Sequence, residues 1–401
     1  MQPSDVTGDG QRLPVSLLTG FLGSGKTTVL NHLLRQPALA KTAVVINEFG
    51  AIGLDHELVE SSSEEMVLLQ SGCLCCTIRG DLLDTLRNLF LRRVKGEIPA
   101  FNRVVIETTG LADPAPILHT LMTDPLLAAR YRLDGVIATV DAATGNATLD
   151  RQIESVKQAA VADRLILTKV DLVARDEVEA LARRLRDLNP GAPIWRALNG
   201  RVSPSQLFNA GLYNPTTKSL DVQRWLNAEA YSSSTDDALH HHDHDAGDRH
   251  DHHAAHGDDH HRHDAPAAHG LDVNRHDEHI KAVCLTLDEP ISPDAFDRWL
   301  EILMMLKGPD ILRVKGILNL VGLAGPLVIH GVQHIFHPAV MLNHWPGEDR
   351  RSRIVFIGRD LDESALRDTL KLFTDKAIED VSAGGVLEDR AAAIVPIEAR
   401  P

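Results

Sequence analysis

The first residues with an evident chemical use form a glycine-rich run near the N-terminus. Its glycines would let backbone N–H groups turn toward a polyphosphate, and the helix after it would add positive potential at its N-terminus. The apolar run 13–19 predicts a buried strand, and the apolar spacing of 29–34 predicts a helix. Strand, glycine-rich loop and helix are the context of a phosphate-binding loop; the alternative is an ordinary glycine turn. The predicted nucleotide contacts are Gly20, Gly23, Ser24, Gly25, Lys26, Thr27 and Thr28.

Four residues would complete the phosphate and magnesium chemistry. Lys26 can reach the β- and γ-phosphates, and the Thr27 hydroxyl can bind Mg²⁺. Glu107 ends the predicted buried strand 101–107, where many nucleotide-binding proteins place a Walker B aspartate that holds Mg²⁺ or its water. Gly110 then starts the segment in which a second switch would meet the γ-phosphate. These positions predict a bound magnesium–nucleotide complex.

The segment after the predicted strand 41–46 carries Glu48, Asp55 and His56. In a P-loop GTPase the segment after the first helix senses the γ-phosphate, so these side chains lie where a switch and a metal could meet. A solvated turn is the alternative.

A motif that would recognise the base of the nucleotide follows the predicted strand 164–167. It reads Thr168-Lys169-Val170-Asp171. The Asp171 carboxylate can accept hydrogen bonds from both guanine N1–H and the exocyclic amine, and adenine presents no matching pair. Because the motif comes two strands after Glu107, it predicts GTP as the nucleotide, with Lys169 and Asp171 on guanine.

Three thiols, Cys73, Cys75 and Cys76, follow the predicted strand 66–70 within four residues of loop. Thiolates favour Zn²⁺, Cu(I) or similar ions, and tetrahedral zinc needs one more ligand. Glu48, His56, water or a partner's side chain could supply it. The alternatives are a redox pair and buried structural cysteines.

A histidine- and aspartate-rich tract occupies 232–272. It has almost no large apolar residues, so it predicts a disordered insert between domains. Neutral imidazole suits Zn²⁺, Ni²⁺, Cu²⁺ and Co²⁺, so the tract could capture metal; a solubilising linker is the alternative. The auxiliary metal ligands predicted here are His240, His241, His242 and His244.

Composition narrows the class of protein. A net charge of −15 over 401 residues argues against nucleic-acid or anionic-membrane partners. The first residues lack the pattern of a signal peptide, no apolar run is long enough to span a bilayer, and the four cysteines do not resemble a secreted disulfide framework. These features predict a soluble cytoplasmic protein, and they leave the oligomeric state open.

The alternation of strands and helices over 13–200 predicts an α/β fold, a doubly wound sheet with helices on both faces. A smaller α+β domain is predicted after the insert, with strands near 280–287, 311–320, 327–336 and 352–357, a helix starting near Ser292 and a closing helix from Asp362 to about Phe373. The predicted divisions are an N-terminal extension 1–12, a P-loop GTPase domain 13–231, the insert 232–275, a C-terminal domain 276–378 and a tail 379–401.

These motifs, in this order, resemble the CobW-like family of P-loop GTPases. The resemblance runs through 20–28, 47–50, 73–76, 107–114 and 168–171, and continues through 225–227, 313–316 and 355–358 into a CobW-type C-terminal domain. Thr168 stands where many GTPases have Asn, a variant that also occurs within the family. The resemblance implies slow GTP hydrolysis coupled to holding and releasing a metal, with Zn²⁺, Co²⁺ or Fe as cargo.

The function expected from the sequence is therefore a GTP-hydrolysing metallochaperone. It would bind Zn²⁺ through the three cysteines and deliver it to client metalloproteins recognised through the C-terminal domain. Alternatives are a Co²⁺ insertion factor for cobalamin or nitrile-hydratase assembly, and a histidine-rich zinc buffer or sensor. The residues expected to carry catalysis are Lys26, Thr27, Glu48 and Glu107.

Overall fold

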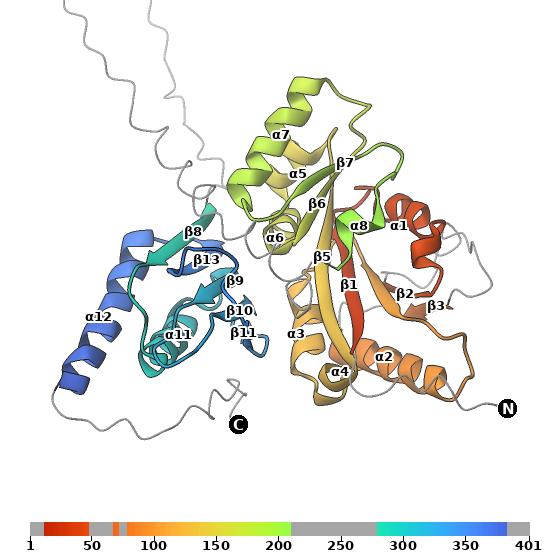
Figure 1. The fold of residues 1–401 in the computed structure, drawn as a ribbon. Helices are drawn as coiled ribbons and strands as arrows, with labels where there is room; N and C mark the ends of the chain where they lie inside the picture. The colour runs from red at the N-terminus through yellow and green to blue at the C-terminus, as the bar shows by residue number, and fades with distance from the viewer. Residues whose placement is uncertain (1–11, 48–66, 72–77, 210–278, 383–401) are drawn as a thin grey trace, which may run out of the picture.

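The computed structural model describes residues 12–47, 67–71, 78–209 and 279–382. The predictions about Glu48, the three cysteines of 73–76 and the histidine-rich tract lie outside these residues. The described chain forms two domains side by side, the first up to Asn209 and the second from His279 (Figure 1).

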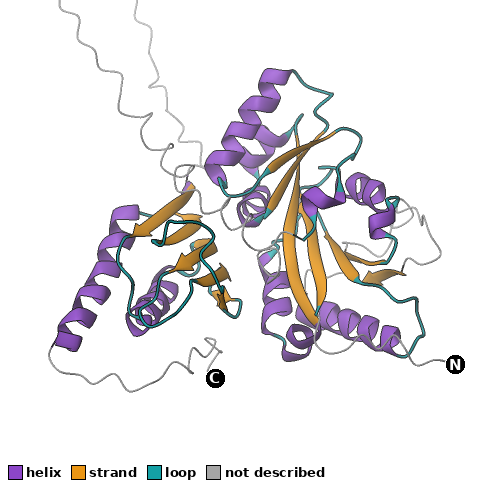
Figure 2. Ribbon diagram, viewed as in Figure 1, coloured by secondary structure: helices purple, strands orange, loops and turns teal. Residues whose placement is uncertain are grey.

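The first domain is built on a parallel sheet, with helices on both sides (Figure 2). Its seven described strands lie in the order β3-β2-β4-β1-β5-β6-β7. They are β1 (Leu13–Gly20), β2 (Thr42–Asn47), β3 (Val67–Ser71), β4 (Arg103–Thr108), β5 (Tyr131–Asp141), β6 (Arg164–Thr168) and β7 (Ile194–Ala197). The predicted α/β fold is confirmed.

Both faces of this sheet are buried, which explains the nearly continuous apolar runs of its strands. Leu17 and its neighbours on alternate positions pack with α2, α3, α6 and α7, whereas Leu18 packs with α1 and α8. The helices are α1 (Lys26–Leu34), the 3₁₀-helix η1 (Pro37–Leu39), α2 (Ile78–Val94), α3 (Ala115–Thr123), α4 (Pro125–Arg130), α5 (Gly145–Arg151), α6 (Ile153–Val161), α7 (Arg175–Leu188) and α8 (Pro204–Leu207).

The second domain has an antiparallel sheet in the order β11-β10-β9-β13-β8, with β12 paired to β10. Helices α11 and α12 cover one face, around Trp299 and Phe356. Its elements are β8 (Ile280–Leu287), α11 (Pro293–Lys307), β9 (Ile311–Leu318), β10 (Leu327–Val332), β11 (Ile335–Phe336), β12 (Val340–Met341), β13 (Ser352–Arg359) and α12 (Glu363–Ser382). The predicted α+β architecture is confirmed.

The other face of the second sheet packs against the first domain. Leu312, Val328 and Val355 belong to the same apolar cluster as residues of α3, α6 and α7. The pairing of β9 with β13 shifts between Ile357 and Gly358, which leaves Leu312 as an extra residue and lets both Leu312 and Arg313 contribute to this contact. The two domains therefore share a buried core, in addition to their own.

Two predicted elements differ in extent. The single strand predicted over 327–336 is wrong, because the chain reverses at Gln333, where φ is 53°, and forms the hairpin β10-β11. The closing helix, predicted to end near Phe373, continues to Ser382. No glycine or proline interrupts 374–382, and a glycine pair follows at 384–385. The residues that favour the end of a helix therefore come later in the sequence than Phe373.

Candidate functional site

A pocket of about 250 Å³ opens at the carboxyl ends of β1, β4 and β6. This edge is where open parallel sheets bind ligands. The pocket is lined by Leu22, Gly23, Gly25, Lys26, Thr27, Thr28, Ile46, Glu107, Thr108, Gly110 and Lys169. Residues from four separate predicted motifs thus meet at one place.

The glycine-rich loop adopts backbone conformations that explain its sequence. Gly23 and Gly25 have φ values of 70° and 89°, which favour glycine. A Cβ at Gly20 would lie 2.2 Å from the Thr139 hydroxyl, so a side chain there cannot fit. Helix α1 starts at Lys26 without a side-chain cap, which leaves its first N–H groups for other acceptors, as in anion-binding loops.

Hydroxyl groups on β5 and β6 hold the glycine-rich loop in place through hydrogen bonds. The Ser24 hydroxyl lies 2.6 Å from that of Thr139 on β5, and the Thr168 hydroxyl donates to the Ser24 carbonyl at 2.7 Å. Lys26 donates to the carbonyls of Gly20 and Phe21 at 3.0 and 3.2 Å. The loop is therefore shaped before a ligand arrives. The contribution of Thr139 and Thr168 was not predicted; both are polar residues on buried strands, which is the signal that could have found them.

Thr27 and Glu107 meet inside the pocket. The Thr27 hydroxyl donates to Glu107 Oε1 at 2.7 Å, although the two residues are 80 positions apart in the sequence. Glu107 is 5% exposed. A hydroxyl and a carboxylate in contact form an oxygen donor set that suits Mg²⁺. This geometry fits the predicted magnesium ligands.

Lys169 and Asp171 lie at and just beyond the end of β6. Lys169 has a positive φ of 55°, and its ammonium group contacts the Asp141 carboxylate at 2.6 Å. Asp141 also accepts from the backbone N–H of Ala143, so it is fixed in place. The Asp171 side chain is exposed, which leaves its carboxylate accessible to a base. Sequence reasoning missed Asp141, a carboxylate at the carboxyl end of a parallel strand.

The Gly110 loop touches the phosphate loop directly. A Cβ at Gly110 would come within 2.5 Å of the Leu22 backbone nitrogen. On its other side, the Gln158 side chain of α6 donates to the carbonyls of Gly110 and Ala112 at 3.2 and 3.0 Å. Gln158 was not predicted, because a glutamine on an amphipathic helix carries no sequence signal.

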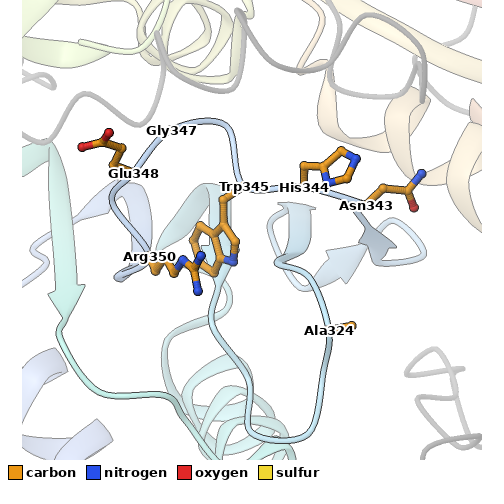
Figure 3. Close-up of a pocket in the computed structure, with 7 residues that line it drawn as sticks. All are labelled: Ala324, Asn343, His344, Trp345, Gly347, Glu348 and Arg350. Atoms are coloured by element: carbon orange, nitrogen blue, oxygen red, sulfur yellow. The ribbon is translucent and has the colours of Figure 1, made fainter.

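A second hollow, of about 480 Å³, lies on the C-terminal domain (Figure 3). Apart from Ala324, its lining comes from one loop, namely Asn343, His344, Trp345, Gly347, Glu348 and Arg350. Trp345 also packs against the apolar cluster shared by the two domains. Among the residues described, no three histidine, cysteine, aspartate or glutamate side chains gather as a metal site. In the same residues, no helix is long and apolar enough to cross a membrane.

The fold and the pocket define a P-loop nucleotide-binding protein with an appended α+β domain. Comparison with protein families identifies the particular family. Residues 14–196 match the model of the CobW/HypB/UreG nucleotide-binding domain, and residues 280–374 match that of the cobalamin synthesis protein CobW C-terminal domain. The chain belongs to the CobW family and is a P-loop GTPase.

Its relatives include the zinc chaperone YjiA of Escherichia coli, 32% identical over 88% of this chain and 96% of the relative. The zinc-regulated GTPase metalloprotein activator 1 of Schizosaccharomyces pombe is 34% identical over 53% of each chain. The crystal structure of Zn(II)-bound YjiA GTPase from E. coli superposes with a TM-score of 0.62 at 27% identity, covering 91% of this chain and 99% of that one.

Proposed function

We propose that this protein is a GTP-hydrolysing metallochaperone that binds Zn²⁺ through Cys73, Cys75 and Cys76 and passes it to client metalloproteins. The observation that carries the proposal is the register of three neighbouring strands. Asn47 at the end of β2 pairs with Ser71 at the end of β3 on one side and with Thr108 of the pocket on the other. Neighbouring strands lie about 4.8 Å apart, so Ser71 is roughly 10 Å from Thr108.

Chain connectivity extends this argument to the predicted metal ligands. Glu48 follows Asn47 directly, and Cys73 comes two residues after Ser71. The segments that carry these ligands therefore leave the sheet beside the phosphate pocket. A γ-phosphate and a metal could then bias the same two segments. The names of the relatives given above support zinc as the metal.

Within this proposal, Lys26 and the residues of 20–28 bind the phosphates, and Lys169 and Asp171 bind guanine. Thr27 and Glu107 would hold Mg²⁺, which neutralises charge on the β- and γ-phosphates when bound. Glu48 is proposed as a switch or water-positioning residue, and the histidines of 240–244 as auxiliary metal ligands. The domain limits 13–231 and 276–378 remain proposals.

The client is proposed to contact the C-terminal domain at the hollow of Figure 3. His344 and Arg350 are exposed there, beside a half-buried Trp345. An aromatic ring next to an exposed arginine is a combination enriched at protein interfaces. A zinc buffer centred on the histidine-rich tract, and Co²⁺ as the cargo, are the two competing functions.

The proposal is tested by competition titration of Zn²⁺ and Co²⁺ on protein lacking 232–272. The titration is made in Mg·GDP and in a non-hydrolysable Mg·GTP analogue. The proposal expects one tight equivalent with the analogue, which the triple variant Cys73→Ser, Cys75→Ser, Cys76→Ser loses. Equal affinity in the two nucleotide states would remove coupled delivery, and loss of most metal capacity with the deletion alone would favour the buffer.

A further inference from the structure

Helix α6 touches both the phosphate pocket and the C-terminal domain. In the C-terminal half of α6 (Ile153–Val161), Gln158 is buried and donates from one amide nitrogen to the carbonyls of Gly110 and Ala112. Lys157, one residue earlier, contacts the Asp113 carboxylate at 2.8 Å. Three residues of the loop 110–113 are thus held by two consecutive side chains of one helix.

These contacts fix the loop where it meets the ligand. Gly110 lines the phosphate pocket and packs against the Leu22 backbone so closely that no side chain fits. A shift of the Gly110 loop would therefore move the pocket wall next to the γ-phosphate position. Gln158 Oε1 is buried without a hydrogen-bond partner among the described residues, so the recorded hydrogen bonds of this amide are those from its nitrogen to the loop.

The C-terminal end of α6 leads directly to Asp163, whose side chain is fully buried. Asp163 Oδ1 accepts from Arg313 Nη2 at 2.8 Å and from Lys315 Nζ at 2.7 Å, both on β9 of the C-terminal domain. Its other oxygen accepts from the backbone N–H of Val136 at 2.9 Å. This carboxylate therefore ties the end of α6, the central sheet and the second domain together.

A second helix makes the same connection. Helix α3 begins just after the Gly110 loop, and its buried His119 lies 3.0 Å from the Val332 carbonyl of β10. The helix that clamps the loop and the helix that continues from it thus both contact the C-terminal sheet (Figure 1).

We propose that Gln158 is a positioning residue for GTP hydrolysis, and that α6 couples the Gly110 loop to the C-terminal domain through Asp163. A partner bound to that domain would then change the hydrolysis rate without touching the nucleotide. This inference rests on the proposed assignment of the phosphate pocket. It does not depend on the metal, so nucleotide measurements without metal test it separately from metal delivery.

The test uses the full chain and the variant Gln158→Met, which keeps the length of the side chain and removes its donor. We expect kcat to fall about tenfold. Affinity for a non-hydrolysable GTP analogue should fall by a similar factor, while affinity for GDP stays within about twofold, because GDP has no γ-phosphate for the Gly110 loop to meet.

The matched control is Asn189→Leu. Asn189, which follows α7, is also a buried amide, and it donates to carbonyls at the end of α6, those of Ala159, Ala160 and Ala162, at 2.9 to 3.1 Å, away from the loop. Its loss should lower stability and leave the ratio of analogue to GDP affinity unchanged. A fall in both affinities of Gln158→Met, or no fall in kcat, overturns the positioning role. Lys26→Ala distinguishes a failed positioning role of Gln158 from a misassigned phosphate pocket. Hydrolysis would survive this substitution only if the pocket does not bind the phosphates.

The link to the second domain is tested by Lys315→Met, alone and combined with Gln158→Met. Alone it should lower kcat a few-fold with GDP affinity unchanged. In the double variant kcat should equal that of Gln158→Met, because the contact between α6 and the Gly110 loop is already lost. An unchanged kcat for Lys315→Met, or multiplying losses in the double variant, overturns the coupling.

Discussion

The phosphate pocket and the domain interface both gather charged side chains, but they use them in opposite ways. In the pocket, Thr27 and Lys169 are partly exposed, and each makes one side-chain contact with a carboxylate of the same domain. At the interface, Asp163 and Arg313 are no more than 1% exposed and bond across the two domains. Side chains of the pocket can exchange their present partners for a ligand. At the interface, removal of one partner leaves an uncompensated buried charge and lowers the stability of the protein.

The charge balance sharpens this difference. The interface places two cations, Arg313 and Lys315, on one carboxylate. Burial alone would raise the pKa of Asp163, but the two cations together hold it well below its usual range. Burial first, and the neighbouring Arg313 second, lower the pKa of His330, which keeps its ring neutral beside the guanidinium. The interface therefore keeps Asp163 charged and the His330 ring neutral.

The largest expected effect is on the pocket, with Lys26→Ala. GTP hydrolysis should fall on the order of 10³-fold, because the ammonium group meets the phosphates, while the melting temperature changes little because Lys26 donates to carbonyls of its own loop. The control is Lys307, a half-buried lysine of the C-terminal domain that contacts Asp310 of the same domain. Equal losses for Lys26→Ala and Lys307→Ala would show that the pocket is misassigned.

Among substitutions at the interface, Asp163→Asn should destabilise the protein most, because it leaves Arg313 and Lys315 buried without a carboxylate. We expect unfolding to become easier by about 3–5 kcal/mol in urea titration. Lys315→Met is the paired comparison and should cost about 1 kcal/mol or less, since Asp163 keeps Arg313. Similar losses in the two variants would contradict a cluster with one shared carboxylate.

A third prediction concerns the base. Asp171→Asn should change the preference between guanine and xanthine nucleotides by roughly 10- to 100-fold, because the carboxylate that accepts from guanine is lost. Competition between GDP and XDP measures this. Asp176→Asn, an exposed aspartate in the first turn of α7, should leave the preference unchanged. An unaltered preference in the Asp171 variant would place the base elsewhere.

The last prediction is a pH dependence of stability from Lys315. Burial, partly offset by Asp163, lowers the pKa of this lysine from 10.5 to about 8. Between these values the unfolded chain binds more protons than the folded one, so stability should rise with pH over this window, with a slope of up to about 1.4 kcal/mol per pH unit. Urea unfolding from about pH 8 to 10 should show this rise in the native chain and a flatter curve in Lys315→Met. Parallel curves would exclude Lys315 as its source.

The pocket was largely predictable from sequence because a phosphate loop depends on local backbone geometry. Gly23 and Gly25 adopt left-handed backbone conformations that favour glycine, so the glycine spacing itself predicts them. Glu107 was predictable because it ends a buried strand whose partners in the sheet are implied by the α/β pattern. The Thr27–Glu107 contact then follows from topology.

The interface could not be predicted in this way. Asp163 and Lys315 are 152 residues apart, and no periodicity relates them. His330 is buried beside Arg313 of its own domain, and Arg313 reaches Asp163 only because the two folded domains pack together. The hairpin after β10 depends on a positive φ at Gln333, a residue type that gives no warning of a turn.

The central claim is that γ-phosphate and zinc act on the same segments, and nucleotide affinity tests it most directly. We would measure the affinities for a non-hydrolysable Mg·GTP analogue and for Mg·GDP, each with and without Zn²⁺, on protein lacking 232–272. Because coupling between sites is reciprocal, zinc should raise the ratio of analogue to GDP affinity by about tenfold, and the triple cysteine variant should lose this increase. A ratio that zinc leaves unchanged would contradict the account.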